Sequence, residues 1–571
     1  MRSCLWIFFA ALSAGSSSFG QNSDAADYSR LFNNQIGYLP SAPKIALVSS
    51  PTGLPFEIID AEADRSVLKG MLELAEPENQ AGGADLWLAD FSIVKATGNY
   101  ILSVEGIGKS DPFQIDDRIY APLASRALSV FTLHRSGIAL PKILAGNWGR
   151  DASHIHDGFL FSEAPGNPQI HPATGGWFDG SDYGKYVVKG NYAAGMLLTL
   201  YEFFPQAFPD GSLMAPERGN GAPDLLDEVR WQLEFVLRMQ NDQGAFYHKV
   251  TSLNPISPIP PEKDESERFV FPPSTAATAG ACALLAKASR LYSPLDATFA
   301  AACRQSAQRG WNFLTAHAQN IEFENPPNVH TKNYRDIDDA DERFWAAVEL
   351  YLATNDPVYQ TGAIAIERKR IPLLSAAGYW GNVMPLAIAS LLKAEPDSFD
   401  KELREAAVKD LLSLADILVE KTRSNGFQLS LREEDFSWGS NGALLQNAFI
   451  LCLAHTHSQK RAYKLAALDQ LHAVLGRNPL SICYVTGFGR RSPKRPYHFI
   501  SMTDKFDDPV PGLLVAGPNP TLGDSAVKKA FSSGAAPATI YLDSEESLST
   551  NDADLTRNAA LAFIASYFSF E

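Results

Sequence analysis

The chain has 571 residues, of which 45% are hydrophobic and 11% aromatic, a composition typical of a folded chain with an ample core. Its formal net charge is −16 and its sequence pI is about 5.2, which argue against nucleic acid and anionic membranes as partners. The acidic balance suits an enzyme for neutral substrates, and the length indicates several domains or one unusually large one.

The first twenty residues have the pattern of a secretory signal. Arg2 supplies the positive charge, Leu5–Leu12 the apolar run and Ser13–Gly20 the small residues of a cleavage region. That run is too short to span a bilayer, and no later segment has 18 uninterrupted apolar residues. We expect a signal peptide over residues 1–20, a secreted or periplasmic protein, and no membrane insertion.

Short β-type runs separated by turn residues follow over residues 29–116. Their spacing of about ten residues, with Gly, Pro and Asp between them, fits a small antiparallel β-sandwich. This region contains no His and no convincing catalytic constellation, so we expect it to stabilise the domain that follows. The runs are Lys44–Val48, Phe56–Ile59, Asp85–Leu88, Asn99–Val104 and Asp111–Ile115.

Helical periodicity dominates from about Tyr120 to the end of the chain. Apolar residues recur at i, i+3 and i+4, and long irregular loops separate the segments, which favours one helical toroid over a bundle. The stretch 476–551 is rich in Gly, Pro and aromatics, and we expect it to form active-site loops. The predicted helices are 118–136, 184–203, 223–241, 275–293, 297–318, 340–353, 356–366, 380–393, 401–421, 441–457, 460–475 and 552–569.

The cysteines show no metal or disulfide pattern. Four remain after the signal segment, all in or beside apolar runs and none spaced as C-x-x-C. We expect buried free thiols rather than a disulfide framework or a zinc site. They are Cys282, Cys303, Cys452 and Cys483.

One stretch, Gly175–Tyr186, carries two carboxylates on a Gly- and Ser-rich turn. Asp179 and Asp182 lie three residues apart, and aromatic residues flank them. Carboxylates at this spacing can point the same way and hold one water, as a general base requires. The alternative is a plain turn in which Asp182 caps the next helix.

Several further stretches, read in order, extend the pattern across almost the whole chain after the signal segment. Together with Gly175–Tyr186 they resemble glycoside hydrolase family 9, and more closely those members with an immunoglobulin-like domain before an (α/α)6 barrel. The stretches are Phe32–Pro40, Asn220–Glu228, Asp341–Ala347, Trp438–Asn441, Gly476–Pro479, Tyr484–Gly489, Pro511–Asn519 and Tyr541–Ala560.

This resemblance implies a fold and a reaction. The fold is mainly α: an (α/α)6-barrel catalytic domain over residues 117–571, preceded by a small all-β immunoglobulin-like sandwich over residues 29–116. Most members are β-1,4-glucanases that act with inversion, and a minority are exo-acting on glucosides or glucosamine oligomers. The expected activity is therefore inverting hydrolysis of a β-1,4-glucan or oligosaccharide, with exo action on oligosaccharides as the alternative.

By the same resemblance, three carboxylates carry the chemistry. Asp182 would be the general base, Asp179 would help to fix the water, and Asp552 would be the general acid. The family's acid is a Glu after Asn, whereas this chain has Asn551-Asp552, one methylene shorter. A misplacement of about 1 Å can cost on the order of 100-fold in rate. Two alternatives stay open: Asp552 caps the last helix, or Glu545 or Glu546 substitutes for it.

The resemblance also marks residues for sugar binding. The family has His-His-Arg where this chain has Tyr497-His498-Phe499, so His498 keeps one sugar contact, and Phe499 would replace charged hydrogen bonding by stacking. Other candidates for the substrate site are Trp438, Tyr183, Trp177 and Tyr541.

No organic cofactor is required, and we predict no structural zinc. Some relatives hold zinc through Cys and His, but here the comparable segments carry Ser136 and Ser153, and a hydroxyl is a poor zinc ligand. His154, His156 and His171 could suggest a metal, but solvated or capped loop histidines are the simpler interpretation. Calcium occurs in some relatives and is possible here, with no ligands assigned.

The short acid keeps a second class of function open. A carbohydrate-binding protein with weak or no activity could share this fold and cleft. Aryl glycosides with good leaving groups would separate the two classes, because their cleavage needs less protonation.

Overall fold

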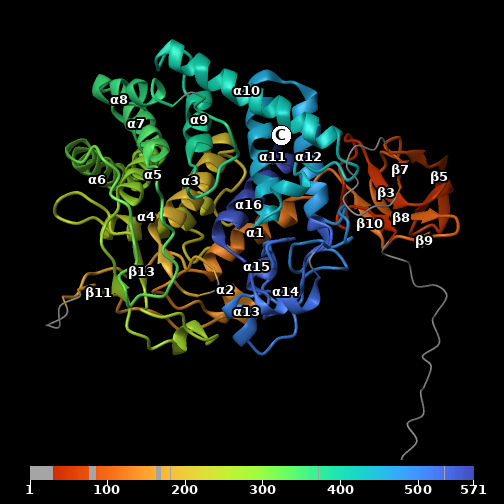
Figure 1. Cartoon of the computed structure of the whole chain (residues 1–571), viewed down its shortest axis with the longest axis horizontal. Coiled ribbons are helices and arrows are strands. Elements are labelled where there is room, and N and C mark those ends of the chain that lie inside the picture. The colour runs from red at the N-terminus through yellow and green to blue at the C-terminus, as the bar shows by residue number, and fades with distance from the viewer. Residues whose placement is uncertain (1–29, 76–84, 163–168, 181, 371, 533) are drawn as a thin grey trace, which may run out of the picture.

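The computed structural model describes residues 30–75, 85–162, 169–180, 182–370, 372–532 and 534–571. The predicted signal peptide lies outside these residues. The described chain forms a β part, red and orange at the right of Figure 1, beside a much larger helical part. Within the described residues, no helix is both long and apolar enough to cross a bilayer.

The β part is a sandwich of two sheets in the described residues. One sheet has the order β1-β3-β7-β6 and the other β2-β10-β8-β4-β5, with β9 paired to β8. The five predicted runs are confirmed as β3, β4, β7, β8 and β10. The strands are β1 Leu31–Phe32, β2 Gly37–Tyr38, β3 Ile45–Ser49, β4 Pro55–Asp60, β5 Arg65–Met71, β6 Glu73–Leu74, β7 Leu86–Asp90, β8 Gly98–Val104, β9 Gly108–Lys109 and β10 Phe113–Ile115.

A polar contact joins the sandwich to the helical part. Gln35 donates its side-chain amide to Ser481 O at 2.8 Å and accepts from the backbone N–H groups of Arg490 and Arg491. Nearby, the Tyr120 hydroxyl bridges Asn34 and His472, both buried. Buried polar groups that are satisfied only across an interface make separation costly, so the two parts are held as one body.

The helical part is an (α/α)6 barrel. In the described residues, six helices form a closed inner ring in which each packs on the next, in the order α3, α5, α7, α9, α11, α16 and back to α3. Helices of an inner ring are buried on all sides. In α11, for example, every residue from Ser440 to His455 is buried apart from Ala443. Their bounds are α3 Val187–Phe203, α5 Thr275–Tyr292, α7 Ala340–Thr354, α9 Met384–Lys393, α11 Ser440–Ser458 and α16 Leu555–Phe570.

Six further described helices pack outside this ring, each against an inner partner. Their burial follows one stripe, as in α10, where Leu403, Ala407, Leu411, Leu414 and Leu418 are buried at spacings of three and four. All twelve predicted helices are present, with ends shifted by a few residues. The outer helices are α1 Ala121–Leu133, α4 Asp224–Arg238, α6 Ala297–Ala316, α8 Pro357–Glu367, α10 Lys401–Arg423 and α12 Arg461–Val474.

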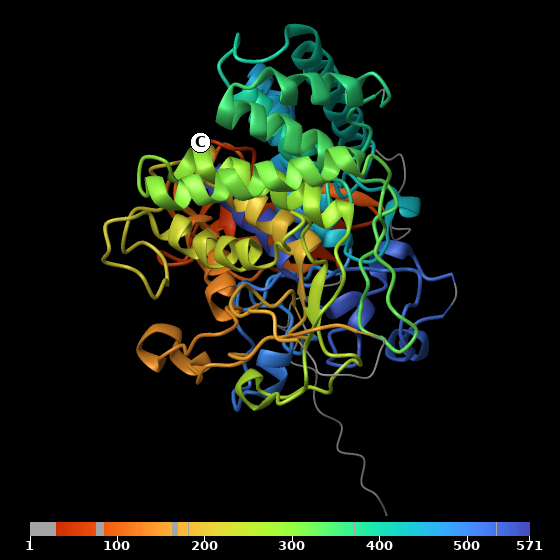
Figure 2. The ribbon, with the colours of Figure 1, turned by 90° about the vertical axis from the view of Figure 1, so that its left-hand side faces the viewer.

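Loops and short elements gather at one end of the ring, the lower end in Figures 1 and 2. Sequence periodicity did not predict these pieces, since each is too short to show a repeat. They include a small sheet of order β11-β14-β13-β12. The bounds are α2 Lys142–Ala145, β11 Phe159–Leu160, β12 Lys185–Tyr186, β13 Lys249–Thr251, β14 Phe269–Val270, α13 Phe499–Thr503, α14 Ser525–Ala530 and α15 Leu548–Asn551.

The predicted free thiols are confirmed. All four cysteines of the described chain are unpaired and buried, in α5, α6, α11 and the loop after α12.

Candidate active site

A pocket of about 550 Å³ opens among the loops, and the three predicted catalytic carboxylates all line it. Asp179 and Asp182 reach it from the turn before β12, and Asp552 from the segment between α15 and α16. The remaining walls combine aromatic rings with charged side chains. These are Tyr334, Tyr379, Trp380 and Trp438, with Lys189, Lys332, Asp554 and Arg557.

The backbone itself brings the turn and the C-terminal segment together. Leu555 N–H donates to Asp179 O at 2.9 Å. Between them, Gly180 lies so close to Ala553 that a Cβ at residue 180 would collide with the Ala553 carbonyl oxygen. A glycine is therefore required at this close approach, and it lets residues almost four hundred positions apart share one pocket.

Asp182 is held by neutral donors. Its Oδ1 accepts from Gly184 N–H at 2.9 Å and its Oδ2 from the Tyr186 hydroxyl at 3.1 Å. No ion pair to Asp182 occurs among the described residues. A carboxylate oriented in this way is fixed in place without a paired cation, which suits the predicted general base.

Asp179 is buried and has a charged donor. Its Oδ2 accepts from Lys189 Nζ at 2.7 Å and from the Tyr334 hydroxyl at 3.2 Å. Its Oδ1 is buried and finds no hydrogen-bond partner in the part of the chain that the structure describes. Burial raises the pKa of Asp179 to about 6 although Lys189 opposes the shift. Because this oxygen has no accessible surface, the predicted contact of Asp179 with a water stays a prediction.

Asp552 is anchored through one oxygen. Its Oδ1 accepts from Trp438 Nε1 at 3.2 Å and from Arg557 Nη2 at 3.0 Å. Burial raises the pKa of Asp552, and the Arg557 guanidinium opposes that shift. Both donors take the same oxygen, so neither of them occupies the other oxygen, which suits the predicted general acid.

Asp552 does not cap the last helix. The helix was predicted from residue 552, but it begins at Leu555, and its N-cap is Asp554, whose Oδ1 accepts from Arg557 N–H at 2.9 Å. The alternative in which Asp552 serves only as a helix cap is therefore wrong. A β-bridge from Tyr497 to Asp552 instead keeps the acid's backbone extended.

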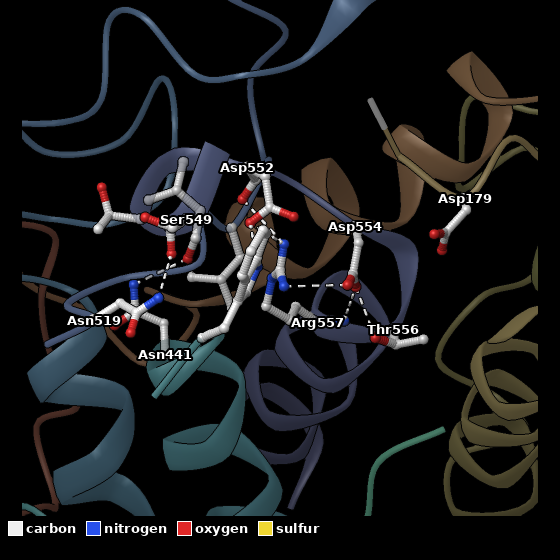
Figure 3. A network of polar contacts seen from close by, with 12 residues as sticks. Asp179, Asn441, Asn519, Ser549, Asp552, Asp554, Thr556 and Arg557 are labelled. Atoms are coloured by element: carbon white, nitrogen blue, oxygen red, sulfur yellow. Dashed lines mark hydrogen bonds and ion pairs between the residues drawn. The ribbon is translucent and has the colours of Figure 1, made fainter. Parts of the chain in front are cut away.

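Asp554 and its cations were missed by the sequence analysis. Figure 3 shows Asp554 between Arg557 and Asp179. Its Oδ2 accepts from Lys189 Nζ at 3.0 Å and from Arg557 Nη1 at 3.1 Å. Burial would raise the pKa of Asp554, but these two cations hold it far below its usual range. The signal in the sequence was an Asp three residues before an Arg at a helix start.

Trp438 is the predicted sugar-binding residue that does line the pocket. Its ring is 41% exposed, its indole N–H holds Asp552, and Lys332 Nζ lies 5.1 Å from the ring centroid. The ring is thus fixed at the pocket edge and can stack on a sugar face. Tyr334, Tyr379 and Trp380 form a second aromatic group that the sequence motifs did not mark.

His498 lies behind the pocket wall and has no exposed surface. Its Nε2 bonds to His134 Nε2 at 2.9 Å, and His134 Nδ1 bonds to Phe178 O next to Asp179. Burial lowers the pKa of both histidines, that of His134 to about 4. Without accessible surface His498 does not reach a sugar, so its place is to support the Asp179 turn.

Tyr183, Trp177 and Tyr541 are also buried rather than exposed to the pocket. Tyr183 donates to Ile259 O, and Trp177 donates to Glu228 in α4. Tyr541 donates to the side chain of Asn551, immediately before Asp552. These side chains hold the catalytic segments from behind, because their polar groups are already satisfied inside the protein.

Phe499 does not replace the family's Arg as a sugar contact. It is 1% exposed and packs edge-on against Tyr183, with Tyr497 beside it. Burial of this apolar ring in the core is favourable, because it removes apolar surface from water. The ring is therefore not exposed to the cleft, and the expected stacking on a sugar does not occur.

The segments compared with a zinc site do not fit zinc. Ser136 Oγ and Ser153 Oγ are buried without hydrogen-bond partners among the described residues, and a hydroxyl is a poor substitute for thiolate. His154 Nε2 bonds to Asp264, and His171 Nε2 to Arg238 O. The described residues bring no three His, Cys, Asp or Glu side chains together as metal ligands.

The acidic start of α7 is the part that comes nearest to a cation site. Glu342 is buried with both oxygens unpartnered in the described structure, and burial raises its pKa well above the usual range. Asp341 is already used by Arg370 and by Val383 N–H. Asp336 and Asp339 also keep one buried oxygen each without a partner in the described structure. These carboxylates do not form a group of three metal ligands among the described residues, so no calcium ligands are assigned.

A closed ring of six helix pairs with a carboxylate-bearing, aromatic-walled pocket is an arrangement suited to a carbohydrate-cleaving enzyme. Residues 120–565 match the family described as Glycosyl hydrolase family 9, and residues 27–109 match the Cellulase N-terminal ig-like domain. The chain therefore belongs to glycosyl hydrolase family 9, with an immunoglobulin-like domain before its catalytic barrel. Its activity class is that of an O-glycosyl hydrolase of the β-1,4-glucanase type.

Individual relatives agree with this placement. The chain is 32% identical to a xyloglucan-specific endo-beta-1,4-glucanase of Bacteroides ovatus, over 93% of this chain and 92% of the relative. It is also 32% identical to a cellodextrinase of Butyrivibrio fibrisolvens, over 93% and 98%. A metagenome-derived family 9 endoglucanase structure superposes with a TM-score of 0.87 at 34% identity, over 95% of this chain and 99% of that chain.

Proposed function

We propose that this protein is an exported, inverting hydrolase of soluble β-1,4-glucans, in which Asp182, Asp179 and Asp552 do the chemistry. One observation carries the proposal: these three carboxylates, predicted from two motifs far apart in the chain, line one pocket beside an exposed tryptophan. Inversion needs a base and an acid on opposite sides of the scissile bond with room for water between them.

In the proposed reaction, water replaces the leaving sugar at the anomeric carbon in a single displacement. Asp182 takes a proton from water while the water oxygen forms a bond to the anomeric carbon. The bond from that carbon to the glycosidic oxygen breaks, and Asp552 gives its proton to the departing oxygen. Asp179, which lines the pocket on the same turn as Asp182, helps to fix the same water.

The walls support a sugar chain as substrate. Trp438 lies at the edge of the pocket where the acid is anchored, and Trp380 with Tyr379 forms another wall. Aromatic faces bind the apolar faces of sugar rings without needing charge, which suits neutral glucans. The relatives named for xyloglucan and for cellodextrins direct the test to soluble chains and oligosaccharides.

The test is product release from xyloglucan, carboxymethyl-cellulose, cello-oligosaccharides and chitosan oligosaccharides. We expect glucan cleavage, with the new reducing end appearing first as the α-anomer in proton NMR spectra recorded during the reaction. A β-anomer as the first product would exclude inversion. Mid-chain products would indicate endo action, and single units released from one end would indicate exo action.

One observation favours a weakly active, sugar-binding alternative: the candidate acid is tied to a guanidinium. Dinitrophenyl cellobioside decides between the two, since its leaving group departs without protonation. Cleavage of this compound together with natural glucans supports the hydrolase. Binding of cello-oligosaccharides with no cleavage of either substrate supports the binding protein.

A further inference from the structure

Alternating charges join the two sides of the pocket. Asp179 contacts Lys189 at 2.7 Å, Lys189 contacts Asp554 at 3.0 Å, Asp554 contacts Arg557 at 3.1 Å, and Arg557 contacts Asp552 at 3.0 Å. We call these five residues the charge chain. It runs from the water-fixing carboxylate to the candidate acid, and Figure 3 shows its Asp179, Asp554, Arg557 and Asp552 members.

The charge chain is shielded from solvent. The side chains of its members are between 4% and 13% exposed. Room for the guanidinium stem comes from Gly442 in α11, where a Cβ would lie 2.7 Å from Arg557 Cγ. At this degree of burial, uncompensated charge is costly, so the balance of charges governs which members are ionised.

That balance requires one proton. Three carboxylates face two cations, so a fully ionised charge chain would keep one negative charge in excess. Asp554 alone touches both cations and is the member that stays ionised. The retained proton is therefore carried by Asp179 or Asp552, the carboxyls at the two ends of the charge chain. Because these groups interact, the pKa values at which they titrate describe the whole charge chain rather than one residue.

We propose that Asp554 is a positioning residue for the hydrolysis: it holds Lys189 and Arg557 between the two end carboxyls and so leaves Asp552 able to carry the proton it donates. The proposal rests on the proposed function, since it takes Asp552 as the acid. Burial and the neighbouring Asp554 charge keep the pKa of Asp552 above its usual value, in line with this role.

Other charged and titratable groups face Asp552 from the surrounding elements. Outside the charge chain they come from the loops before α7 and α13 and from the turn before β12, and none of them contacts Asp554. They are Lys332, Tyr334, Tyr497 and Asp182.

Two substitutions are expected to act in opposite directions. Asp554→Ser removes one carboxylate but keeps a favourable N-cap. Two carboxylates then balance two cations, no proton is retained, and the alkaline limb of the kcat/KM profile moves to lower pH by on the order of 1 unit. Arg557→Gln removes a cation, so the same limb moves to higher pH. The double variant returns towards the wild-type profile.

The matched control is Asp296→Ser. Asp296 caps α6, accepting from Phe299 N–H at 2.9 Å, and pairs with Arg230 at 3.0 Å, but it lies outside the pocket. It repeats the loss of a cap and an ion pair without touching the charge chain, so its pH profile should match that of the wild type. Thermal unfolding of each full-length variant identifies any loss of fold.

A substrate pair separates proton supply from general damage. Asp554→Ser should lose at least tenfold more activity on a cello-oligosaccharide than on dinitrophenyl cellobioside, because the latter needs no proton from Asp552. Equal losses on both substrates, or limbs that move in the same direction in Asp554→Ser and Arg557→Gln, would overturn the proposal.

The proposed function and this inference fail in different ways. If the wild-type protein cleaves no glucan, the proposed function is wrong. The pKa of Asp552 can then still be measured by carbon-13 NMR titration of labelled aspartate carboxyls, with Asp552→Asn identifying its signal. A lower titration midpoint for Asp552 in Asp554→Ser supports the inference. An unchanged midpoint overturns it, whatever the activity.

Discussion

The two sides of the pocket hold their carboxylates by different means. Asp182 is oriented by a backbone N–H and a tyrosine hydroxyl, both neutral. Asp552 is oriented by an indole N–H and a guanidinium, and a second carboxylate compensates the guanidinium. A base must be ionised before the reaction and an acid must be protonated, so the same residue type needs opposite surroundings.

The difference shows why a cation beside the acid is tolerable. Arg557 by itself would favour the ionised form of Asp552. Because Asp554 also pairs with that cation, Arg557 fixes the position of the candidate acid while Asp554 offsets part of its charge.

Removing the base should have the largest effect. Asp182→Ala should lower kcat by about 10²–10⁴-fold, because no other described carboxylate that lines the pocket is held by neutral donors alone. Steady-state kinetics on the best glucan substrate measures this. Tyr186→Phe, which removes one neutral donor, should lose much less, and a loss as large as that of Asp182→Ala would contradict the assignment.

Removing the acid should be costly only when the leaving group needs a proton. Asp552→Ala should lower kcat on cello-oligosaccharides by about 10²–10³-fold but lower it far less on dinitrophenyl cellobioside. The pair of rates measured on one preparation gives the ratio. Asp182→Ala serves as the control, since it should lose activity on both substrates, and an equal loss for Asp552→Ala would remove Asp552 from the acid's role.

Asp179 should make stability depend on pH. Its pKa is about 6 in the fold, above the usual value, so the native state holds the proton more tightly than the unfolded chain. The resulting stabilisation is complete below about pH 4 and is lost as the pH rises through 6, amounting to about 3 kcal/mol.

Urea unfolding at pH 4, 5, 6 and 7 measures that slope. Asp179→Asn should flatten it across this window, whereas Asp296→Asn, at a helix start outside the pocket, should leave it in place. A difference in unfolding free energy between wild type and Asp179→Asn that stays constant from pH 4 to pH 6 would contradict the raised pKa.

The smallest effect should come from the indole donor. Trp438→Phe keeps a ring at the pocket edge but removes the hydrogen bond to Asp552, so we expect a loss of less than tenfold and an alkaline limb at higher pH. Trp380→Phe is the matched change on the opposite wall and should leave the limb unchanged. A limb that moves equally in both variants would show that ring size, not the hydrogen bond, is responsible.

Most of the fold could be predicted from local pattern. The i, i+3, i+4 spacing in α10 and the alternation in β8 follow from which face meets the core, so both elements are visible in sequence. Short helices such as α15 could not be predicted, because four residues are too few to show a periodic pattern. The start of α16 was predicted three residues too early, because Asp is favoured at a helix N-cap and the sequence alone does not distinguish Asp552 from Asp554 as that cap.

The site was predictable where a motif contains its own partners. Asp179 and Asp182 share one turn, so their common pocket was visible. His498 was not, because its partner His134 lies 364 positions away and their contact buries both rings. Asp554 was missed for a similar reason: one of its cations, Lys189, comes from a helix at the other end of the barrel domain's sequence.

The contact of Gly180 with Ala553 has a practical consequence for enzyme design. Since main chain meets main chain there, with Leu555 N–H bonded to Asp179 O, the frame that carries the two reactive groups does not depend on the side chain at position 552. The length of that side chain becomes a single adjustable variable. Asp552→Glu would thus compare a short with a long proton donor on one unchanged scaffold, a comparison that two natural enzymes never offer.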